Sequence, residues 1–403
     1  MGNKRIFIFV VFAFLAVLFS TCKKAETSTP KNTFFKEFGD WSPGPSIESI
    51  FQMPDGGFLL AGSGGKTGFV PVFIRTTKSG GLLWKKQIDN DTFPAYFYLK
   101  KNDGTFIING YSPPYNNYIS KLDTFGNVLA YNKVYHYRRY IYFNSFGAVE
   151  TPDGNNLISM SDGWDQGAPS DNYIEKYDNN LNLMDSVNLR DYPNLPGKTL
   201  LFNAYNAMPS GVYYAWGVRF PRYPWNWGTN SYPYVALVHA NGAWKLTEID
   251  TTDRGGSYIG EWPIINKDSS LAILSQRYDN ISNTNSAAVS CVDKNLKVSW
   301  HHFYPEIGAS IGVWEISACS DGGYIIAGQA TVGSNSAQPY ALRIDRNGNK
   351  LWSRIFNFSG SVTFNIAIQT NDEGFAFAGY TSSFGAGKSS QVIFIKTDKN
   401  GNF

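Results

Sequence analysis

The sequence predicts an all-β protein, and three observations carry this prediction. Short apolar runs are separated throughout by Gly, Pro, Asn and Ser, and no stretch has the apolar spacing of a long amphipathic helix. Aromatic residues make up 16% and charged residues 17% of the 403 residues, and roughly 25% charged is usual for a soluble chain. The octet DGGFLLAG at 55–62 returns almost unchanged as DGGYIIAG at 321–328, which indicates one body built from repeats.

The first segment, residues 1–21, has the features of an export signal. Lys4 and Arg5 precede an apolar run that ends at Phe19, and this run is shorter than the about 20 residues that span a bilayer. The stretch LFSTC at 18–22 resembles the lipobox of bacterial lipoproteins, with Phe19 and Thr21 in place of the commonest residues. The resemblance implies cleavage before Cys22 and a lipid on its thiol. The alternative is an ordinary cleaved leader whose cysteine carries no lipid.

The next segment, residues 22–32 (CKKAETSTPKN), has the composition of a flexible tether. A lipidated Cys22 would anchor the protein to a membrane, and we expect an outer-membrane lipoprotein that faces the periplasm or the cell surface. The remainder, residues 33–403, is expected to be a single domain.

One turn recurs along this domain at intervals of roughly 50 residues. Asp and Gly suit it, because Asp accepts hydrogen bonds from the amides that follow it and Gly tolerates positive φ. The seven turns are Asp55-Gly56-Gly57, Asp103-Gly104, Asp153-Gly154, Pro209-Ser210-Gly211, Asp268-Ser269-Ser270, Asp321-Gly322-Gly323 and Asp372-Glu373-Gly374.

Each turn joins two of four predicted strands, which we name A to D. Strand A precedes the turn, and strand B follows it as an apolar run such as FLLAG or YIIAG. Strand C alternates, as in YALRID, and strand D follows a second turn such as DRNGN, with Trp84, Trp300 and Trp352 in matching positions. Four-stranded antiparallel units of this length are typical of β-propeller blades. The sequence therefore predicts a seven-bladed β-propeller of four-stranded antiparallel blades.

The two chain ends predict how this ring closes. The seventh unit stops at KTDKNGNF (396–403), after its C–D turn, so it has no strand D of its own. TFFKEFG at 33–39 resembles the strand D of LWSRIFNFSG at 351–360. We expect this N-terminal strand to complete the last blade, which would leave no exposed edge at the junction. The expected product is a monomer.

The repeat resembles that of secreted bacterial propellers with the pattern D-G-G-y-i-i-a-G followed by k-x-D-x-n-G-n-x-x-W. The plan is similar to that of the quinoprotein (PQQ-like) and outer-membrane-assembly lipoprotein propellers, and more loosely to WD40 rings. The resemblance covers about residues 33–403 and is weakest in the fourth unit. It implies an architecture and leaves the activity open.

Antiparallel pairing places the A–B and C–D turns at one face and the B–C and D–A connections at the other. The second face varies from unit to unit, and we expect the ligand there, including the mouth of the central channel. The richest connection is WGVRFPRYPWNWGTNSYPY at 216–234. Its aromatic and basic side chains suit stacking on sugars or anchoring of a protein, although they could also pack on one another. The candidate ligand-binding residues are Trp216, Arg219, Arg222, Tyr223, Trp225, Trp227 and Tyr232, with Arg138, Arg139 and Trp164 on neighbouring connections.

Several kinds of chemistry lack a signature. The chain offers no nucleophile elbow, no facing carboxylate pair and no cofactor motif, so no catalytic residue, cofactor or metal site is predicted. The acidic loop at 161–172 fits no EF-type calcium spacing. His301 and His302 are adjacent in a strand, where alternation sends their rings to opposite faces. The formal net charge is only +3, which argues against nucleic acid as a partner. Cys291 and Cys319 are expected as two buried thiols, with a disulfide as the alternative.

Three functions remain open. The first is a non-catalytic, membrane-anchored module that binds a glycan or a protein. The second is an enzyme acting on an extracellular polymer, and the third is an envelope-assembly scaffold.

Overall fold

The structure is a computed structural model, and it describes residues 33–39, 46–64, 70–88, 95–112, 116–134, 143–151, 153–162, 171–188, 200–207, 212–219, 232–239, 244–248, 257–259, 263–279, 281–333, 335–381 and 390–403. Asn32–Phe403 forms a compact unit, separate from Met1–Lys31. The predicted signal peptide, Cys22 and the tether lie outside the described residues. Among those described, no helix has the length and apolarity to cross a bilayer.

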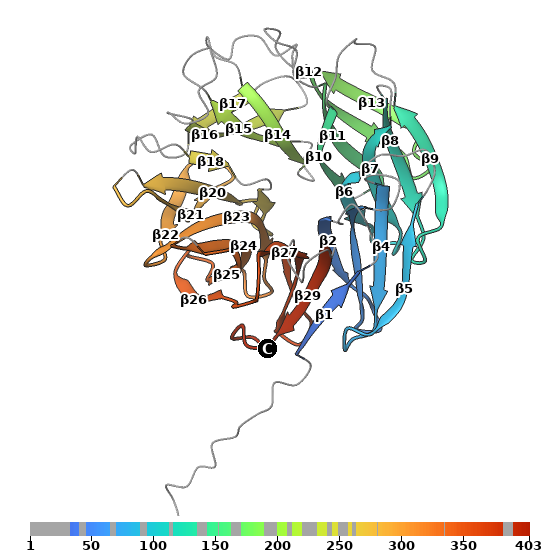
Figure 1. Cartoon of the computed structure of the whole chain (residues 1–403). Helices are drawn as coiled ribbons and strands as arrows, with labels where there is room; N and C mark the ends of the chain where they lie inside the picture. The colour runs from blue at the N-terminus through green and yellow to red at the C-terminus, as the bar shows by residue number, and fades with distance from the viewer. Residues whose placement is uncertain are drawn as a thin grey trace, which may run out of the picture. The chain divides into compact units, whose positions relative to one another are not determined.

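The described residues form seven antiparallel sheets that follow the chain order (Figure 1). The first four sheets pair their strands consecutively. Their strands are β2 (Ser46–Gln52), β3 (Phe58–Gly64), β4 (Val70–Thr76) and β5 (Leu82–Gln87); β6 (Ala95–Lys100), β7 (Phe106–Ser112), β8 (Asn116–Leu122) and β9 (Val128–Val134); β10 (Phe143–Glu150), β11 (Asn156–Asp162), β12 (Asp171–Tyr177) and β13 (Leu183–Asn188); and β14 (Leu200–Ala207), β15 (Val212–Arg219), β16 (Tyr232–His239) and β17 (Trp244–Glu248).

In the fifth sheet, strand A is divided into two short pieces that both pair with the next strand, where the sequence predicts one strand. The seventh sheet takes its fourth strand, β1, from the start of the domain. These strands are β18 (Ser257–Ile259), β19 (Ile264–Ile265), β20 (Leu271–Asp279), β21 (Thr284–Val292) and β22 (Val298–Tyr304); β23 (Ala309–Ala318), β24 (Tyr324–Val332), β25 (Gln338–Ile344) and β26 (Lys350–Ile355); and β27 (Val362–Gln369), β28 (Phe375–Thr381), β29 (Gln391–Thr397) and β1 (Phe34–Phe38).

The strand expected at 33–39 is thus present as β1, and it pairs antiparallel with β29. Phe34 lies opposite Lys396 and Phe38 lies opposite Val392. The ring of Phe34 packs edge-on against Phe58 of the first sheet at 6.3 Å between centroids and against Phe394 of the seventh at 5.1 Å. β1 therefore joins the two ends of the domain through both backbone pairing and a shared apolar core.

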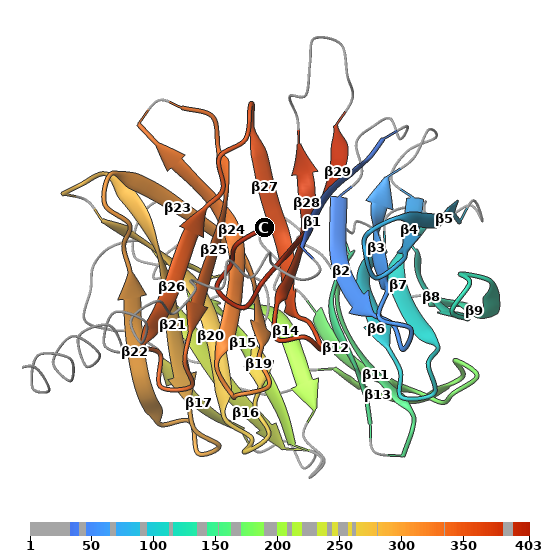
Figure 2. The ribbon, with the colours of Figure 1, turned by 90° about the horizontal axis from the view of Figure 1, so that it is seen from below.

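Each sheet contacts the next one along the chain, and the seventh contacts the first through β27, β28 and β2. Figure 2 shows this succession from a second side. The middle strands are buried on both faces, as in β3 and β4, because a neighbouring sheet covers each face. The fourth strands are more exposed, as in β5 and β26. The chain therefore has an all-β, propeller-like fold, which confirms the predicted fold class at this level.

Candidate functional site

The A–B and C–D turns lie at one edge of each sheet, which we call the turn edge. In the second, third, fifth, sixth and seventh sheets, the C–D turn is stabilised by the aspartate that opens it. Asp345 Oδ1 accepts from the amides of Asn347 and Asn349 at 2.8 Å, and its Oδ2 accepts from the Asn349 side chain at 2.9 Å. The side-chain hydrogen bond from Asn349 holds the pKa of Asp345 below its usual value, against the opposing effect of burial. The same bonds recur around Asp123, Asp178 and Asp398.

The A–B turns use their aspartate differently, because a cation from strand C reaches it. Arg343 donates to both carboxylate oxygens of Asp321 at 2.6 Å, and Arg75 donates to Asp55 at 2.5 Å. The hydrogen bond from Arg75 is the largest cause of the lowered pKa of Asp55. Lys121, Lys176 and Lys396 make the corresponding ion pairs in the second, third and seventh sheets. In the fifth sheet Cys291 occupies this strand position, opposite Trp300 as Arg343 is opposite Trp352.

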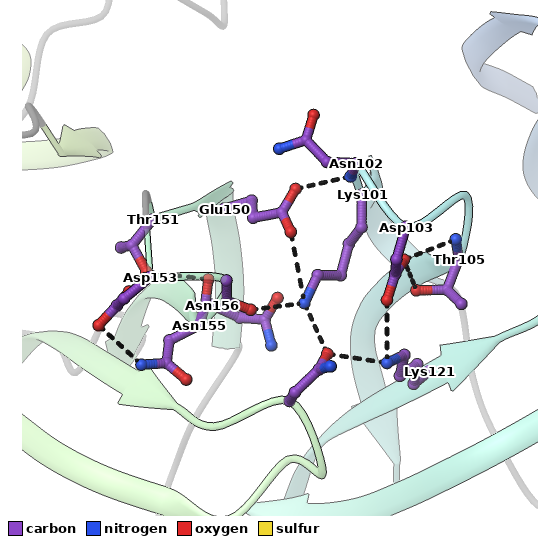
Figure 3. Close-up of polar contacts among 12 residues, drawn as sticks. Lys101, Asn102, Asp103, Thr105, Lys121, Glu150, Thr151, Asp153, Asn155 and Asn156 are labelled. Carbon is purple, nitrogen blue, oxygen red and sulfur yellow. Dashed lines mark hydrogen bonds and ion pairs between the residues drawn. The ribbon is translucent and has the colours of Figure 1, made fainter.

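A polar cluster links the second and third sheets at this edge (Figure 3). Lys101 is 3% exposed, and its ammonium donates to the carbonyl of Gly154 at 2.8 Å and to Asn179 Oδ1 at 2.7 Å. Glu150 Oε1 lies 3.7 Å from the same nitrogen, while Glu150 Oε2 accepts from the Asn102 amide at 2.7 Å. The cluster therefore links the two sheets, and its groups already have protein partners.

The bond from the Asn102 amide to Glu150 has counterparts between other sheets. The amide of Ser320 donates to Gln369 Oε1 at 2.7 Å, and the amide of Asn371 donates to Gln52 Oε1 at 2.8 Å across the junction of the seventh and first sheets. At the turn edge, the charged and amide groups described above thus serve to hold turns and neighbouring sheets.

The opposite edge, with the B–C and D–A connections, is called the loop edge. Strand A carries a β-bulge in six sheets, which adds one residue that the partner strand does not match, and in the sixth sheet this residue lies midway along β23. Bulges re-aim a side chain and are frequent near binding sites. The extra residues are Glu48, Tyr96, Phe146, Asn203, Trp314 and Asn365.

Two of these residues reach the first strand of the following sheet. Asn365 Nδ2 donates to Ser46 Oγ at 2.9 Å, and Trp314 Nε1 donates to Thr363 Oγ1 at 3.1 Å. Trp314 is nevertheless 42% exposed, which is high for so large an apolar side chain in strand A. Its indole is fixed by a hydrogen bond and presents a ring to solvent, an arrangement suited to stacking on an apolar face of a ligand.

Glu48, the extra residue of the first sheet, lies in a second polar group at the loop edge. Ser63 Oγ donates to Glu48 Oε1 at 3.0 Å, and the buried Tyr98 of the second sheet donates its hydroxyl to the carbonyl of Gly62. Burial raises the pKa of Tyr98 well above its usual value, and the negative charge of Glu48 adds to the effect. The bulge residues with described side chains thus offer one carboxylate, one amide and one indole.

The structure corrects the expected connection at 216–234. Trp216 and Arg219 lie in β15 and Tyr232 begins β16, with Arg219 directly opposite Tyr232, so the connection spans only 220–231. The alternation that begins at Val212 simply continues through Arg219, which lengthens the hairpin. Their side chains, and all of Arg222, Tyr223, Trp225, Trp227, Arg138, Arg139 and Trp164, lie outside what the structure describes.

The structure places the cysteine and histidine residues for which the sequence made predictions. Cys291 and Cys319 are free, buried thiols, and burial raises the pKa of Cys319 to about 12. His302 packs beside Trp300 and Tyr304, and His301 packs against Phe303, so the two rings lie on opposite faces of β22 as predicted. His301 Nδ1 lies 2.6 Å from Ser290 Oγ. The described part of the chain contains no group of three or more His, Cys, Asp or Glu able to hold a metal ion.

Two solved structures with TM-scores above 0.5 share the fold of this chain. A polysaccharide lyase of family PL25, an ulvan lyase bound to a -[GlcA(1-4)Rha3S]- saccharide, is 10% identical with a TM-score of 0.53, over 91% of this chain and 97% of that one. A fungal alcohol oxidase of the AA5 family in complex with copper is 12% identical with a TM-score of 0.54, over 92% and 76%. The β-propeller domain of a protease from Pyrococcus furiosus is 9% identical with a TM-score of 0.49, over 92% and 98%. No protein-family model and no curated sequence matches the chain.

Sequence reasoning did not single out two residues at positions that the structure identifies. Trp314 was hidden because a bulge shifts its strand out of strict alternation. Trp244 lies opposite Val238, the register that Trp352 has opposite Arg343, and a search for any aromatic residue at the strand D position would have found it. Phe34, in the strand that was aligned with 351–360, has the same register opposite Lys396.

Proposed function

We propose that this protein is a membrane-anchored, extracytoplasmic lipoprotein whose seven-bladed, closed β-propeller binds a glycan through the loop edge. The observation that carries the binding face is the contrast between the two edges. At the turn edge, the A–B turn aspartates and the cations of strand C bond to one another, and nearby amides bond between sheets. In the middle of β23, by contrast, an exposed indole is held in place beside Thr363, which lies near the loop-edge end of β27.

Three features support the closed seven-bladed ring. The described residues form seven sheets in chain order, β1 pairs with β29, and the last sheet contacts the first. In such a ring the first strands would lie innermost, so Trp314, Asn365 and Glu48 would face the channel, and the sequence predicts Trp225 and Trp227 on a connection at its mouth.

A glycan is favoured over a protein partner because aromatic rings supply stacking faces for sugars while amide and carboxylate groups bind their hydroxyls. The fold shared with a polysaccharide lyase makes extracellular polysaccharides the first class to assay. A protein partner would instead need an apolar area of several hundred Å² at the loop edge.

The test is binding of the purified protein to a glycan and polysaccharide array, with Trp314→Ala and Trp225→Ala/Trp227→Ala as variants. Phe125→Ala is the matched control, because Phe125 is an exposed aromatic residue in a C–D turn at the opposite edge. Loss of one stacking ring should weaken binding about tenfold, which corresponds to the 1–1.5 kcal/mol expected of an aromatic contact. Absence of any glycan ligand, or equal effects of all variants and the control, would refute the proposal.

The anchor has its own test. Cys22→Ser should move the protein from the membrane fraction to the soluble fraction after a high-salt wash, and mass spectrometry of the wild type should find a diacylglycerol on the Cys22 thiol. A variant that stays on the membrane through the wash would show that the lipobox interpretation is wrong.

The enzyme and scaffold alternatives remain proposals of lower rank. Enzymatic cleavage of a polymer would require a pair of carboxylates near the channel mouth. Among the bulge residues whose side chains are described, only Glu48 supplies a carboxylate. An increase in the number of reducing ends when the protein is incubated with its glycan would show that the protein is an enzyme that cleaves the polymer.

A further inference from the structure

Four exposed cations repeat at one position of the turn edge. The second residue of the C–D turn is exposed, and it is Lys78, Lys294, Arg346 and Lys399 in the first, fifth, sixth and seventh sheets. The second and third sheets carry Thr124 and Asn179 there, and the fourth turn, ANGA at 240–243, contains no cation. Because the seventh sheet contacts the first, the four cationic turns belong to four consecutive sheets.

Three of these cations follow a turn aspartate that is less exposed than they are. Asp345 is partly buried and bonds to the amides of its turn, whereas Arg346 beside it is exposed. Asp293 and Asp398 do the same beside Lys294 and Lys399. None of the four cations forms an ion pair with a carboxylate among the described residues, although the charge of Arg346 contributes to the lowered pKa of Asp268 in the A–B turn of the fifth sheet. All four side chains are exposed and can therefore reach an external anion.

The chain enters the domain within this arc of cations. β1 begins at Phe34, which is opposite Lys396, directly before the C–D turn of the seventh sheet. The C–D turn of the first sheet packs on the same residue, since a Cβ on Gly80 would lie 2.7 Å from the Phe34 ring. The start of the domain thus lies between the turns that carry Lys78 and Lys399.

We propose that these four cations form a docking surface for anionic phospholipid headgroups of the membrane that holds the lipid anchor. The proposal rests on the lipoprotein assignment above. Residues 23–33 span at most about 40 Å when fully extended, so a lipid on Cys22 keeps the turn edge near the bilayer. Lys and Arg close to an anionic bilayer each contribute about 1 kcal/mol of binding. The turn edge then faces the membrane, and the loop edge with Trp314 faces away from it, toward the ligand.

The experiment uses residues 22–403 with Cys22→Ser, which contain the compact unit and cannot carry the lipid. Sedimentation is measured with vesicles of phosphatidylcholine alone and with vesicles that also contain phosphatidylglycerol. Arg346→Gln is compared with Lys133→Gln, which removes the same charge from an exposed position next to the loop-edge end of β9.

Binding is expected only to the phosphatidylglycerol vesicles and should fall as salt increases. Arg346→Gln should lower the partition coefficient about fivefold, and replacing all four cations by Gln should abolish sedimentation, while Lys133→Gln changes it less than twofold. Equal partition into both vesicle types, or equal effects of Arg346→Gln and Lys133→Gln, would overturn the docking surface. Neither outcome bears on lipidation or on the glycan array, so failure here is distinct from failure of the proposed function.

Discussion

At the scale of single residues, the repeat motif supplies contacts between sheets as well as turn geometry. The glycine of N-G-N in a C–D turn has positive φ and packs on the strand D aromatic residue of the preceding sheet. Gly348 has φ +82°, and a Cβ there would lie 2.8 Å from the Trp300 ring and 2.6 Å from His302. Gly401 has the same relation to Trp352. The motif's glycine and tryptophan are therefore two halves of one contact between neighbouring sheets.

Gly348→Ala should consequently destabilise the protein more than Gly104→Ala. Both glycines have positive φ, so each substitution costs about 1 kcal/mol for the backbone alone. A Cβ at Gly104 meets nothing within 4 Å, whereas one at Gly348 overlaps two rings, which should cost about 1–3 kcal/mol more. Thermal unfolding midpoints of the two variants give the comparison, and a lower midpoint for Gly104→Ala would contradict this account.

At the scale of elements, neighbouring sheets are joined by residues at equivalent positions, and the chemistry of these residues differs from sheet to sheet. Lys101 occupies the position that is Met53 in the first sheet and Cys319 in the sixth, and all three precede an A–B turn. Glu150 occupies the position of Gln52 and Gln369, which accept the same inter-sheet amide bond without a charge. Between the second and third sheets, a buried ion pair thus occupies two positions that carry an apolar residue and a neutral residue in other sheets.

Lys101→Met should lower the free energy of unfolding by about 3 kcal/mol, because it leaves the Glu150 carboxylate without its cation. The double variant Lys101→Met/Glu150→Gln should recover part of that loss, since it places an apolar and a neutral side chain where Cys319 and Gln369 lie between the sixth and seventh sheets. A double-mutant cycle in urea measures the coupling. Strictly additive effects of the two substitutions would show that the ion pair contributes nothing between these sheets.

At the scale of the whole molecule, the turn aspartates couple stability to pH. Hydrogen bonds to Asp55 and Asp345 lower the pKa of each carboxyl in the folded protein below its value in the unfolded chain. Their contribution is therefore complete above the unfolded pKa of about 4 and is lost as the pH falls through the lower folded pKa. Because hydrogen-bonded turn aspartates recur from sheet to sheet, the turn edge is the acid-sensitive part of the fold.

The free energy of unfolding should accordingly fall steeply below about pH 4. Asp345→Asn should cost about 1 kcal/mol at pH 7 through its turn hydrogen bonds, and this difference from wild type should shrink as acid protonates the wild-type carboxyl. Urea unfolding between pH 3 and pH 7 measures both quantities. A difference that stays constant over this range would show that the Asp345 charge does not stabilise the turn.

The residue pattern alone was enough to predict the all-β class, the N-terminal strand at 33–39 and the six A–B turns that the described residues include. These features are local: Asp and Gly define a turn within five residues, and alternation marks which face of a strand is buried. For the same reason the lipobox, Cys22 and the tether could be proposed from the sequence, and they remain predictions.

Contacts between sheets determine which groups are committed to the fold and which are exposed, and the sequence does not reveal them. The pairing of Glu150 with Lys101, the support of Gly348 by Trp300 and the hydrogen bond from Trp314 to Thr363 each join residues of different sheets. Such contacts depend on how neighbouring sheets are placed in space, and a bulge that shifts one residue changes them without changing the periodicity of the sequence. For that reason the repeat predicted the scaffold, whereas the exposed indole of Trp314 and the arc of cations around β1 emerged only from the fold.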